Sequence, residues 1–239
     1  MIRTDGALDQ SGARWYAGSM KWAIVGALVC SLASGARGEE EVAEPSTGHE
    51  FPVTRTADGH TLMLLGTGVR KKIGFKVYAM ALYVDEVEAR RNFPPLVARA
   101  GGRSRAALLS GDHASQFAIW GAFDKVAILH FVRNVGAEKI KDAFQEGLED
   151  ELSEKSPAEM RKAAEAFVAM FDKELKDGQE IELRTDGDGH ITVTIAGEAK
   201  DGPRSAKLAR AIWSIWLGPK TISADMRKSL VDRIDQLGK

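Results

Sequence analysis

Alternation of hydrophobic and polar positions predicts β-strands in the first half of the chain. Residues 51–56, 61–70 and 75–84 are rich in residues that favour extended structure, and Asp58-Gly59 separates the first two segments. An Asp-Gly pair between such segments is typical of a tight hairpin turn. We therefore expect consecutive antiparallel strands near the start of the folded domain.

A second hairpin is predicted more clearly near residue 190. Residues 180–184 and 190–195 alternate strictly between polar and apolar side chains, and Asp186-Gly-Asp-Gly189 lies between them. This four-residue segment has too few carboxylates for a calcium loop and no glutamate at the required later position. It is therefore interpreted as a turn, and one face of the hairpin is expected to be buried.

Between these hairpins the hydrophobic pattern changes to that of a buried strand followed by two helices. Residues 125–133 contain the continuous apolar run of a buried strand, whereas residues 137–152 repeat apolar side chains every three or four positions. A second helix is expected to begin at Ser156-Pro157, with serine as its cap. The apolar stripe assigned to it is interpreted as core and comprises Met160, Ala164, Phe167, Phe171 and Leu175.

The chain is predicted to end in two further helices, over residues 205–217 and 223–237, separated by Gly218-Pro219. Residues 86–122 receive no detailed assignment, because Pro94-Pro95 is expected to break any helix there. Gly66 and Gly68 predict a bend, or a close approach of another backbone, within the second strand. Strands followed by helices, a hairpin and more helices predict the α+β class.

The N-terminal segment has the pattern of a cleaved export signal. Lys21 precedes an apolar stretch of about a dozen residues, and Ala36-Arg-Gly38 has the small-x-small spacing of a cleavage site. A membrane-spanning helix needs about 20 apolar residues, so a permanent transmembrane anchor is the weaker interpretation. We expect residues 1–38 to be an N-terminal extension and signal peptide, with Met20 as an alternative start, and the mature protein to be periplasmic or secreted.

The mature chain is expected to begin near Glu39 with a solvated linker over residues 39–47, followed by one domain over residues 48–239. Cys30 is the only cysteine and lies in the apolar stretch, so cleavage would leave no disulfide and no cysteine site. A lipid-modified Cys30 is the alternative, but the expected small residue immediately upstream is missing, since Val29 stands there.

Composition limits the partners of the mature domain. The first 38 residues hold four basic and two acidic residues, which leaves 29 basic and 32 acidic residues beyond them. A mildly acidic domain that mixes both signs gives no electrostatic reason to expect a nucleic-acid partner.

The chain lacks the sequence motifs of common catalytic and cofactor sites. It has no phosphate-binding glycine loop with its lysine, no dinucleotide-binding glycine pattern and no serine nucleophile motif. The five histidines are scattered without metal-ligand spacing, so we expect neither a metal nor a cofactor. They are His49, His60, His113, His130 and His190.

Two segments carry a resemblance to a known family. The run Leu64-Leu-Gly-Thr-Gly-Val-Arg70 with the following strand, and the tail Ala211-Ile-Trp-Ser-Ile-Trp-Leu-Gly218 with residues 222–230, resemble the chalcone isomerase-like family. The likeness extends over residues 48–236. It implies an open-faced β-sandwich, in which helices cover one face of a large antiparallel sheet and leave a cleft between the layers.

The family contains enzymes that close chalcones to flavanones, fatty-acid-binding relatives and bacterial members. Arg70 matches the arginine that stabilises the substrate oxyanion in the enzymes, while Tyr78 stands where they have a threonine. The enzymes' other polar site positions align with Gly136, Ala143 and Ile215. The resemblance therefore implies a cleft that keeps Arg70 and Tyr78 but has lost most of the catalytic network.

An arginine in an apolar cleft requires an anion, because its guanidinium cannot release its charge. A carboxylate fits, and Tyr78 would donate a further hydrogen bond to it. The leading hypothesis is therefore an exported, non-catalytic protein that binds a fatty acid or a similar anionic, hydrophobic ligand. Trp213 and Trp216 are interpreted as core residues and not as part of this ligand site.

Two other functions stay open at this stage. The first is a chalcone-flavanone isomerase, an intramolecular lyase that uses Arg70 to stabilise an oxyanion and takes a flavonoid-like ligand. The second is a protein-interaction module, which would require the helix-borne tryptophans to form an exposed patch. Arg70 could also be a solvated residue of the basic run Arg70-Lys71-Lys72 at a strand end.

Overall fold

The computed structural model describes residues 40–149, 151–152 and 156–239. The predicted export signal and Cys30 lie outside these residues. Among the helices of the described part, none is both long enough and apolar enough to cross a membrane.

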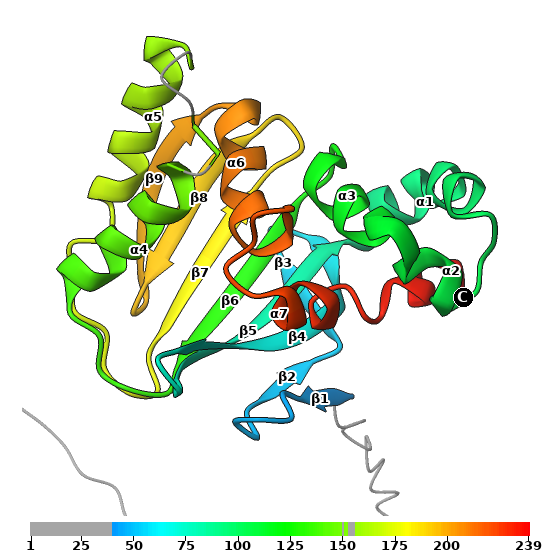
Figure 1. Cartoon of the computed structure of the whole chain (residues 1–239), viewed down its shortest axis with the longest axis horizontal. Coiled ribbons are helices and arrows are strands. Elements are labelled where there is room, and N and C mark those ends of the chain that lie inside the picture. Colours follow the sequence, from blue (N-terminus) through cyan, green and yellow to red (C-terminus); the bar gives the residue numbers. More distant parts are fainter. Residues whose placement is uncertain (1–39, 150, 153–155) are drawn as a thin grey trace, which may run out of the picture. The chain divides into compact units, whose positions relative to one another are not determined.

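A seven-stranded antiparallel sheet forms the centre of the domain, with the strands in sequence order from β3 to β9 (Figure 1). The strands are β3 (Thr54–Ala57), β4 (His60–Lys72), β5 (Phe75–Asp85), β6 (Lys125–Phe131), β7 (Glu180–Thr185), β8 (His190–Ile195) and β9 (Glu198–Arg204). Two short strands, β1 (Glu41–Ala43) and β2 (Glu50–Pro52), pair with each other in a separate sheet.

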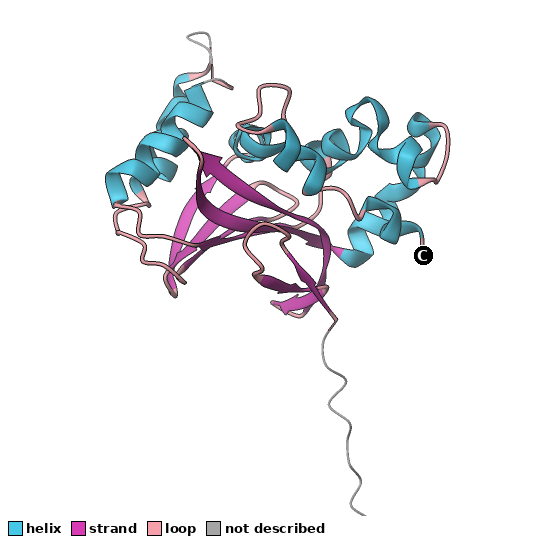
Figure 2. Ribbon diagram, turned by 60° about the horizontal axis from the view of Figure 1, so that its bottom comes forward, coloured by secondary structure: helices cyan, strands magenta, loops and turns pink. Residues whose placement is uncertain are grey.

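The sheet is curled, and the helices cover one of its faces while β1 and β2 lie on the other side (Figure 2). The helical elements are α1 (Glu86–Ala100), α2 (Arg105–Leu109), η1 (Ser110–Asp112), α3 (His113–Trp120), α4 (Ala137–Glu149), α5 (Ala158–Ala169), α6 (Ala206–Leu217), α7 (Ala224–Ser229) and η2 (Ile234–Gly238). The predicted α+β, open-faced β-sandwich is confirmed.

Alternation along the strands divides the apolar side chains between two cores of very different size. On β5, Met80 and Leu82 belong to the large core under the helices, whereas Ala81 and Tyr83 belong to a small cluster on the outer face. The large core also contains the apolar face of α4 and the buried apolar side chains along α6. Most of the apolar burial that stabilises the fold is therefore on the helix side of the sheet.

The expectation that Pro94-Pro95 breaks any helix is wrong. Both prolines lie within α1, where a proline removes one backbone hydrogen bond and kinks the helix. Two features hold α1 together: its Asp85 cap accepts a hydrogen bond from the Glu88 amide, and Phe93 and Leu96 are buried. The exposed prolines are therefore compensated by the cap and by packing on either side of them.

Gly66 lies at a point of β4 where another part of the backbone leaves no room for a side chain. The pairing of β4 with β5 shifts between Leu64 and Gly66, which is a β-bulge. A Cβ atom on Gly66 would lie 2.7 Å from the carbonyl carbon of Leu230, inside van der Waals contact. The predicted close approach of another backbone is confirmed, and its source is the end of α7 together with the next residue, Leu230.

Four other segments differ from the sequence expectations. The described residues 40–47 of the predicted solvated linker are not all solvated, because β1 forms there and Glu44 is only 3% exposed. Ser156 does not cap α5, whose N-cap is Pro157 without a side-chain bond, and α7 ends at Ser229 rather than continuing to residue 237. Strand β9 had no sequence prediction, since residues 198–204 are mostly exposed and do not alternate.

Candidate functional site

The edge of the sheet is incomplete along β4. Strand β3 pairs only with residues 60–63, so residues 66–71 pair with β5 on one side and with no strand of the described chain on the other. The short β3 and the β-bulge at Gly66 together leave this edge of β4 facing a space that other elements border.

That space is a hollow of about 650 Å³, here named the β4 hollow. Three segments border it: residues 42–46 of the N-terminal arm, residues 66–71 of β4, and residues 222–233 around and after α7. Its apolar wall includes Val42, Val69, Ile222 and Met226. Binding sites for small molecules commonly have volumes of about 300–1,000 Å³, so the β4 hollow is large enough for a ligand.

Arg70 borders the β4 hollow and is half-buried. Its Nη1 donates a hydrogen bond of 2.8 Å to the backbone carbonyl of Ile222. A carbonyl dipole orients a guanidinium but does not neutralise it, and Arg70 forms no ion pair with any described carboxylate. The side chain therefore combines a fixed position with donors left for an anion.

Tyr78 is the register partner of Arg70 on β5, but it does not border the β4 hollow. Its hydroxyl accepts a hydrogen bond of 2.9 Å from Nε1 of Trp216, and its ring packs near Phe131. Burial raises the pKa of Tyr78 to about 12, while the Trp216 bond and the charge of Arg70 oppose that rise. The phenol is therefore protonated at neutral pH, and its role in ligand binding stays a prediction.

Arg233 is a second guanidinium at the β4 hollow, and the sequence analysis missed it. Its backbone amide donates to the carbonyl of Leu65 at 2.8 Å, which fixes the chain after α7 against β4. Its Nε is buried and has no hydrogen-bond partner among the described residues. The sequence analysis placed Arg233 within a predicted terminal helix, and no sequence pattern distinguished it from a surface arginine.

The space between the sheet and the helices, where the resemblance implied a cleft, contains packed side chains. Trp213 and Trp216 are almost completely buried there, and Nε1 of Trp213 donates to Thr185 at 2.8 Å. Ile215 is buried against Gly147. The interpretation of Trp213 and Trp216 as core residues is confirmed. Because both are buried, they do not form the exposed patch that the interaction-module hypothesis required.

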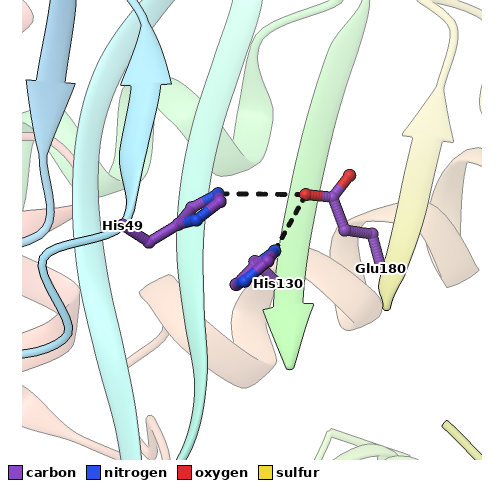
Figure 3. A group of neighbouring side chains, drawn as sticks. All are labelled: His49, His130 and Glu180. Atoms are coloured by element: carbon purple, nitrogen blue, oxygen red, sulfur yellow. Dashed lines mark hydrogen bonds and ion pairs between the residues drawn. The ribbon is translucent and has the colours of Figure 1, made fainter. Parts of the chain in front are cut away.

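Two of the histidines that were expected to be scattered lie together on the outer face of the sheet (Figure 3). His49 stacks on His130 with ring centroids 3.5 Å apart, and Nδ1 of His130 lies 3.1 Å from Oε1 of Glu180. Burial and the neighbouring His130 lower the pKa of His49. No sequence pattern indicated this cluster, because β-sheet register and a loop bring its members together.

Comparison with known proteins agrees with the architecture. A search of curated proteins found no significant sequence match. A solved structure of a fatty-acid binding protein from Arabidopsis thaliana superposes with a TM-score of 0.69 over 83% of this chain and 98% of that one, at 20% identity. The model of the family described as chalcone isomerase-like matches residues 43–117 and 105–232. The chain therefore belongs to the chalcone isomerase-like family.

Proposed function

We propose that this chain is an exported protein that binds a fatty acid or a similar anionic, hydrophobic ligand in the β4 hollow. The observation that carries the proposal is a hollow of about 650 Å³ bordered by two guanidiniums, one of which has a buried donor that no described residue pairs with. An unpaired buried donor costs about 1–3 kcal/mol, which an anionic oxygen would recover.

The charges around the β4 hollow favour an anion at this position. Four cationic side chains border it, whereas two of its three carboxylates already have partners: Glu44 accepts bonds from Ser46 and Thr47, and Asp232 pairs with Arg105. The carboxylate of a ligand would therefore meet cations that lack a carboxylate partner among the described residues. The four cations are Arg70, Lys71, Lys228 and Arg233.

The apolar wall of the hollow would contact the hydrocarbon part of the ligand. Each buried CH₂ contributes about 0.8 kcal/mol before the costs of association and ordering are subtracted. Arg70 and Arg233 would determine the orientation of the ligand, and the hydrocarbon would determine most of the affinity. That a family member with the same fold is a fatty-acid binding protein supports this choice of ligand class.

Mass spectrometry of lipids extracted from the purified protein tests the proposal. We expect a co-purifying fatty acid or related anion, at least ten-fold depleted in Arg70→Ala and in Arg233→Ala. Arg204→Ala is the matched control, because that exposed side chain pairs with Asp186 and Asp188 far from the β4 hollow in sequence. Absence of lipid from every sample, or equal loss in the control, would contradict the proposal.

The isomerase alternative is separated by incubating the protein with a hydroxychalcone. Decay of the chalcone absorbance no faster than in buffer is expected, because the positions of the enzymes' other polar groups hold Gly136, Ala143 and Ile215. Decay that is faster with the wild type and abolished in Arg70→Ala would instead assign an isomerase activity.

Export belongs to the same proposal and needs its own measurement. Residues 20–38 carry the signal pattern, and Ala36-Arg-Gly38 has the spacing of a cleavage site. N-terminal sequencing of the protein made in a secreting bacterial host should give Glu39 as the first residue. A mature protein that retains Met1 or Met20 would contradict export by signal cleavage.

A further inference from the structure

The N-terminal arm, residues 40–52, is held to the outer face of the sheet by few apolar contacts. From the arm, Phe51 is buried in the small apolar cluster on the outer face of the sheet, and Val42 is partly buried there. The remaining buried members of that cluster come from the sheet: Leu62, Leu64, Ala79, Ala81, Tyr83, Val126 and Ile128. An arm with so small a hydrophobic contact needs other interactions to stay in place.

The histidine cluster joins this arm to the sheet. His49 precedes β2 in the arm, while His130 on β6 and Glu180 on β7 are direct register partners. Nε2 of His49 and Nδ1 of His130 lie 3.9 Å and 3.1 Å from the same carboxylate oxygen, Oε1 of Glu180 (Figure 3). One potential ligand atom from each residue lies within 4.8 Å of the other two.

A simple histidine–glutamate pair accounts for only part of this arrangement. The bond between His130 and Glu180 would satisfy both groups, yet a second imidazole, that of His49, stacks on His130, and its Nε2 lies 3.9 Å from Oε1 of Glu180. Glu180 has no lysine or arginine partner in the described part of the chain, and Glu50 adds a further negative charge near His49. The cluster therefore offers lone pairs and negative charge at one point.

We propose that His49, His130 and Glu180 bind a divalent transition-metal ion, for which Zn²⁺ is the best match. Two imidazole nitrogens and one carboxylate oxygen suit Zn²⁺ and its neighbours rather than Mg²⁺ or Ca²⁺, which prefer oxygen ligands. Three protein ligands with water at the fourth position are a known zinc arrangement. The ion would fasten the arm to β6 and β7.

Binding requires a small rearrangement that the cluster permits. Ligand atoms of a tetrahedral zinc site lie about 3.3 Å apart. The ligand atoms here lie within 4.8 Å of one another, so the widest separation must shrink by at most about 1.5 Å and the stacked rings must tilt apart. His130 and Glu180 are carried by paired strands, whereas His49 lies in the loop before β2 and can rotate. Their side chains are 28%, 17% and 44% exposed for His49, His130 and Glu180, so an ion can reach them from solvent.

The same ion would influence the β4 hollow, since residues 42–46 of the arm form one of its walls. The metal proposal does not depend on this link, because the metal site stands whether or not the β4 hollow binds a fatty acid.

Isothermal titration of chelator-treated protein with a zinc salt tests the site. We expect saturable one-to-one binding by the wild type, weakened at least ten-fold in His49→Ala and in Glu180→Gln. His190→Ala is the matched control, because Nε2 of His190 pairs with Asp201 on the neighbouring strand and takes no part in the cluster. Absence of saturable binding, or unchanged binding in both cluster variants, would overturn the proposal.

Cobalt substitution gives a readout that does not depend on affinity alone. A tetrahedral Co²⁺ site produces intense visible absorption bands, which should appear in the wild type and in His190→Ala but not in His49→Ala. His49 is in a loop, so circular dichroism should show His49→Ala folded. Equal bands in His49→Ala, or their loss in His190→Ala, would place the ion elsewhere and contradict the site.

Discussion

Arg70 and Tyr78 are register partners on β4 and β5, but their side chains have different partners. Arg70 donates to the carbonyl of Ile222 and borders the β4 hollow, whereas Tyr78 accepts from Trp216 beneath it. Of the two residues that the sequence analysis assigned to one site, Arg70 borders the β4 hollow and Tyr78 does not, although the charge of Arg70 acts on Tyr78. Arg70 contacts the proposed ligand space, and Tyr78 satisfies a buried tryptophan.

Replacement of Tyr78 by phenylalanine should reduce stability without removing the ligand. Nε1 of Trp216 would lose its acceptor while remaining buried, which costs about 1–3 kcal/mol of unfolding free energy. Urea unfolding measures this loss, and mass spectrometry of the same preparation measures retained lipid. If Tyr78→Phe loses lipid as completely as Arg70→Ala, Tyr78 contacts the ligand and this separation of roles is incorrect.

Glycine at position 66 should be essential to the wall of the β4 hollow. Gly66→Ala forces its Cβ into the backbone around Ser229 and Leu230, and we expect a loss of about 2–3 kcal/mol in unfolding free energy. Gly68→Ala should cost less, because its Cβ meets the flexible Met226 side chain at 3.0 Å. Both variants should also weaken lipid retention.

Gly136→Ala is the control for these substitutions, since a Cβ there has no neighbour within 4 Å. Its unfolding free energy should stay within about 0.5 kcal/mol of the wild type. Thermal or urea unfolding of the three variants gives the ranking directly. A Gly66→Ala protein as stable as Gly136→Ala would show that the chain after α7 can move away from β4.

Local pattern was enough to predict most of the sheet and the helix faces, because burial on one side leaves alternation or a helical repeat in the sequence. The hairpin of β7 and β8 and the apolar face of α4 were predicted for this reason. Strand β9 was not, since an exposed edge strand with Gly202-Pro203 has no buried face to mark it. Arg233 and the pairing of His49 with His130 depend on tertiary contacts alone.

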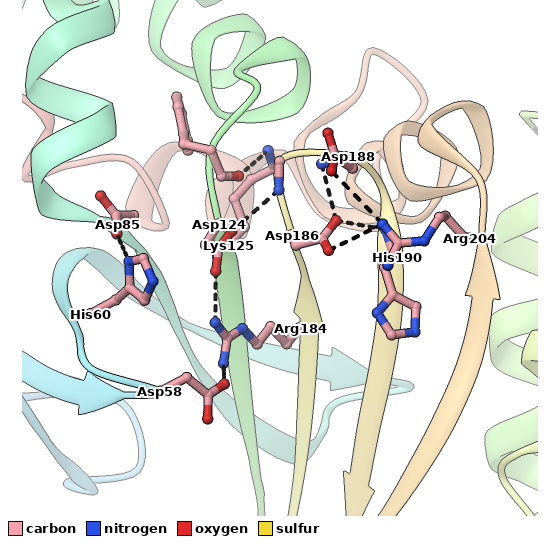
Figure 4. Close-up of polar contacts among 12 residues, drawn as sticks. Asp58, His60, Asp85, Asp124, Lys125, Arg184, Asp186, Asp188, His190 and Arg204 are labelled. Carbon is pink, nitrogen blue, oxygen red and sulfur yellow. Dashed lines mark hydrogen bonds and ion pairs between the residues drawn. The ribbon is translucent and has the colours of Figure 1, made fainter.

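Arg184 should contribute more to stability than an exposed arginine, because it connects three parts of the sheet (Figure 4). On β7 it pairs with Asp58 in the turn before β4, and its Nη2 lies 2.7 Å from Asp124, just before β6. Arg184→Met would leave the largely buried Asp124 carboxylate without its cation. We expect a loss of about 1–3 kcal/mol in unfolding free energy.

The matched substitution for Arg184→Met is Arg204→Met. Arg204 is more than half exposed and lies 3.5 Å from Asp186, so its ion pair is screened by water and should contribute at most about 0.5 kcal/mol. Urea unfolding at moderate salt compares the two variants. Equal effects would mean that the contacts of Arg184 with Asp58 and Asp124 do not stabilise the fold.

Lys125 should make the stability of the domain depend on pH in the alkaline range. Its ammonium donates to the carbonyls of Gly121 at 2.6 Å and Phe123 at 3.2 Å, but burial lowers the pKa of Lys125 to about 8 from its ordinary 10.5. Between pH 8 and pH 10.5, Lys125 keeps its proton in the unfolded chain but has released it in the folded chain. Stability contributed by this group therefore rises with pH across that window.

The size of this effect follows from the shift in the pKa of Lys125. A penalty of about 3 kcal/mol is present in full below pH 8 and disappears as pH approaches 10.5. Lys125→Met removes the titration, so the unfolding free energy of the wild type minus that of the variant should increase by up to this amount over the window. Urea unfolding of both proteins at several pH values measures the difference, in which the titration of the buried tyrosines cancels. A difference that does not change with pH would show that Lys125 keeps an ordinary pKa and that its carbonyl partners fully replace water.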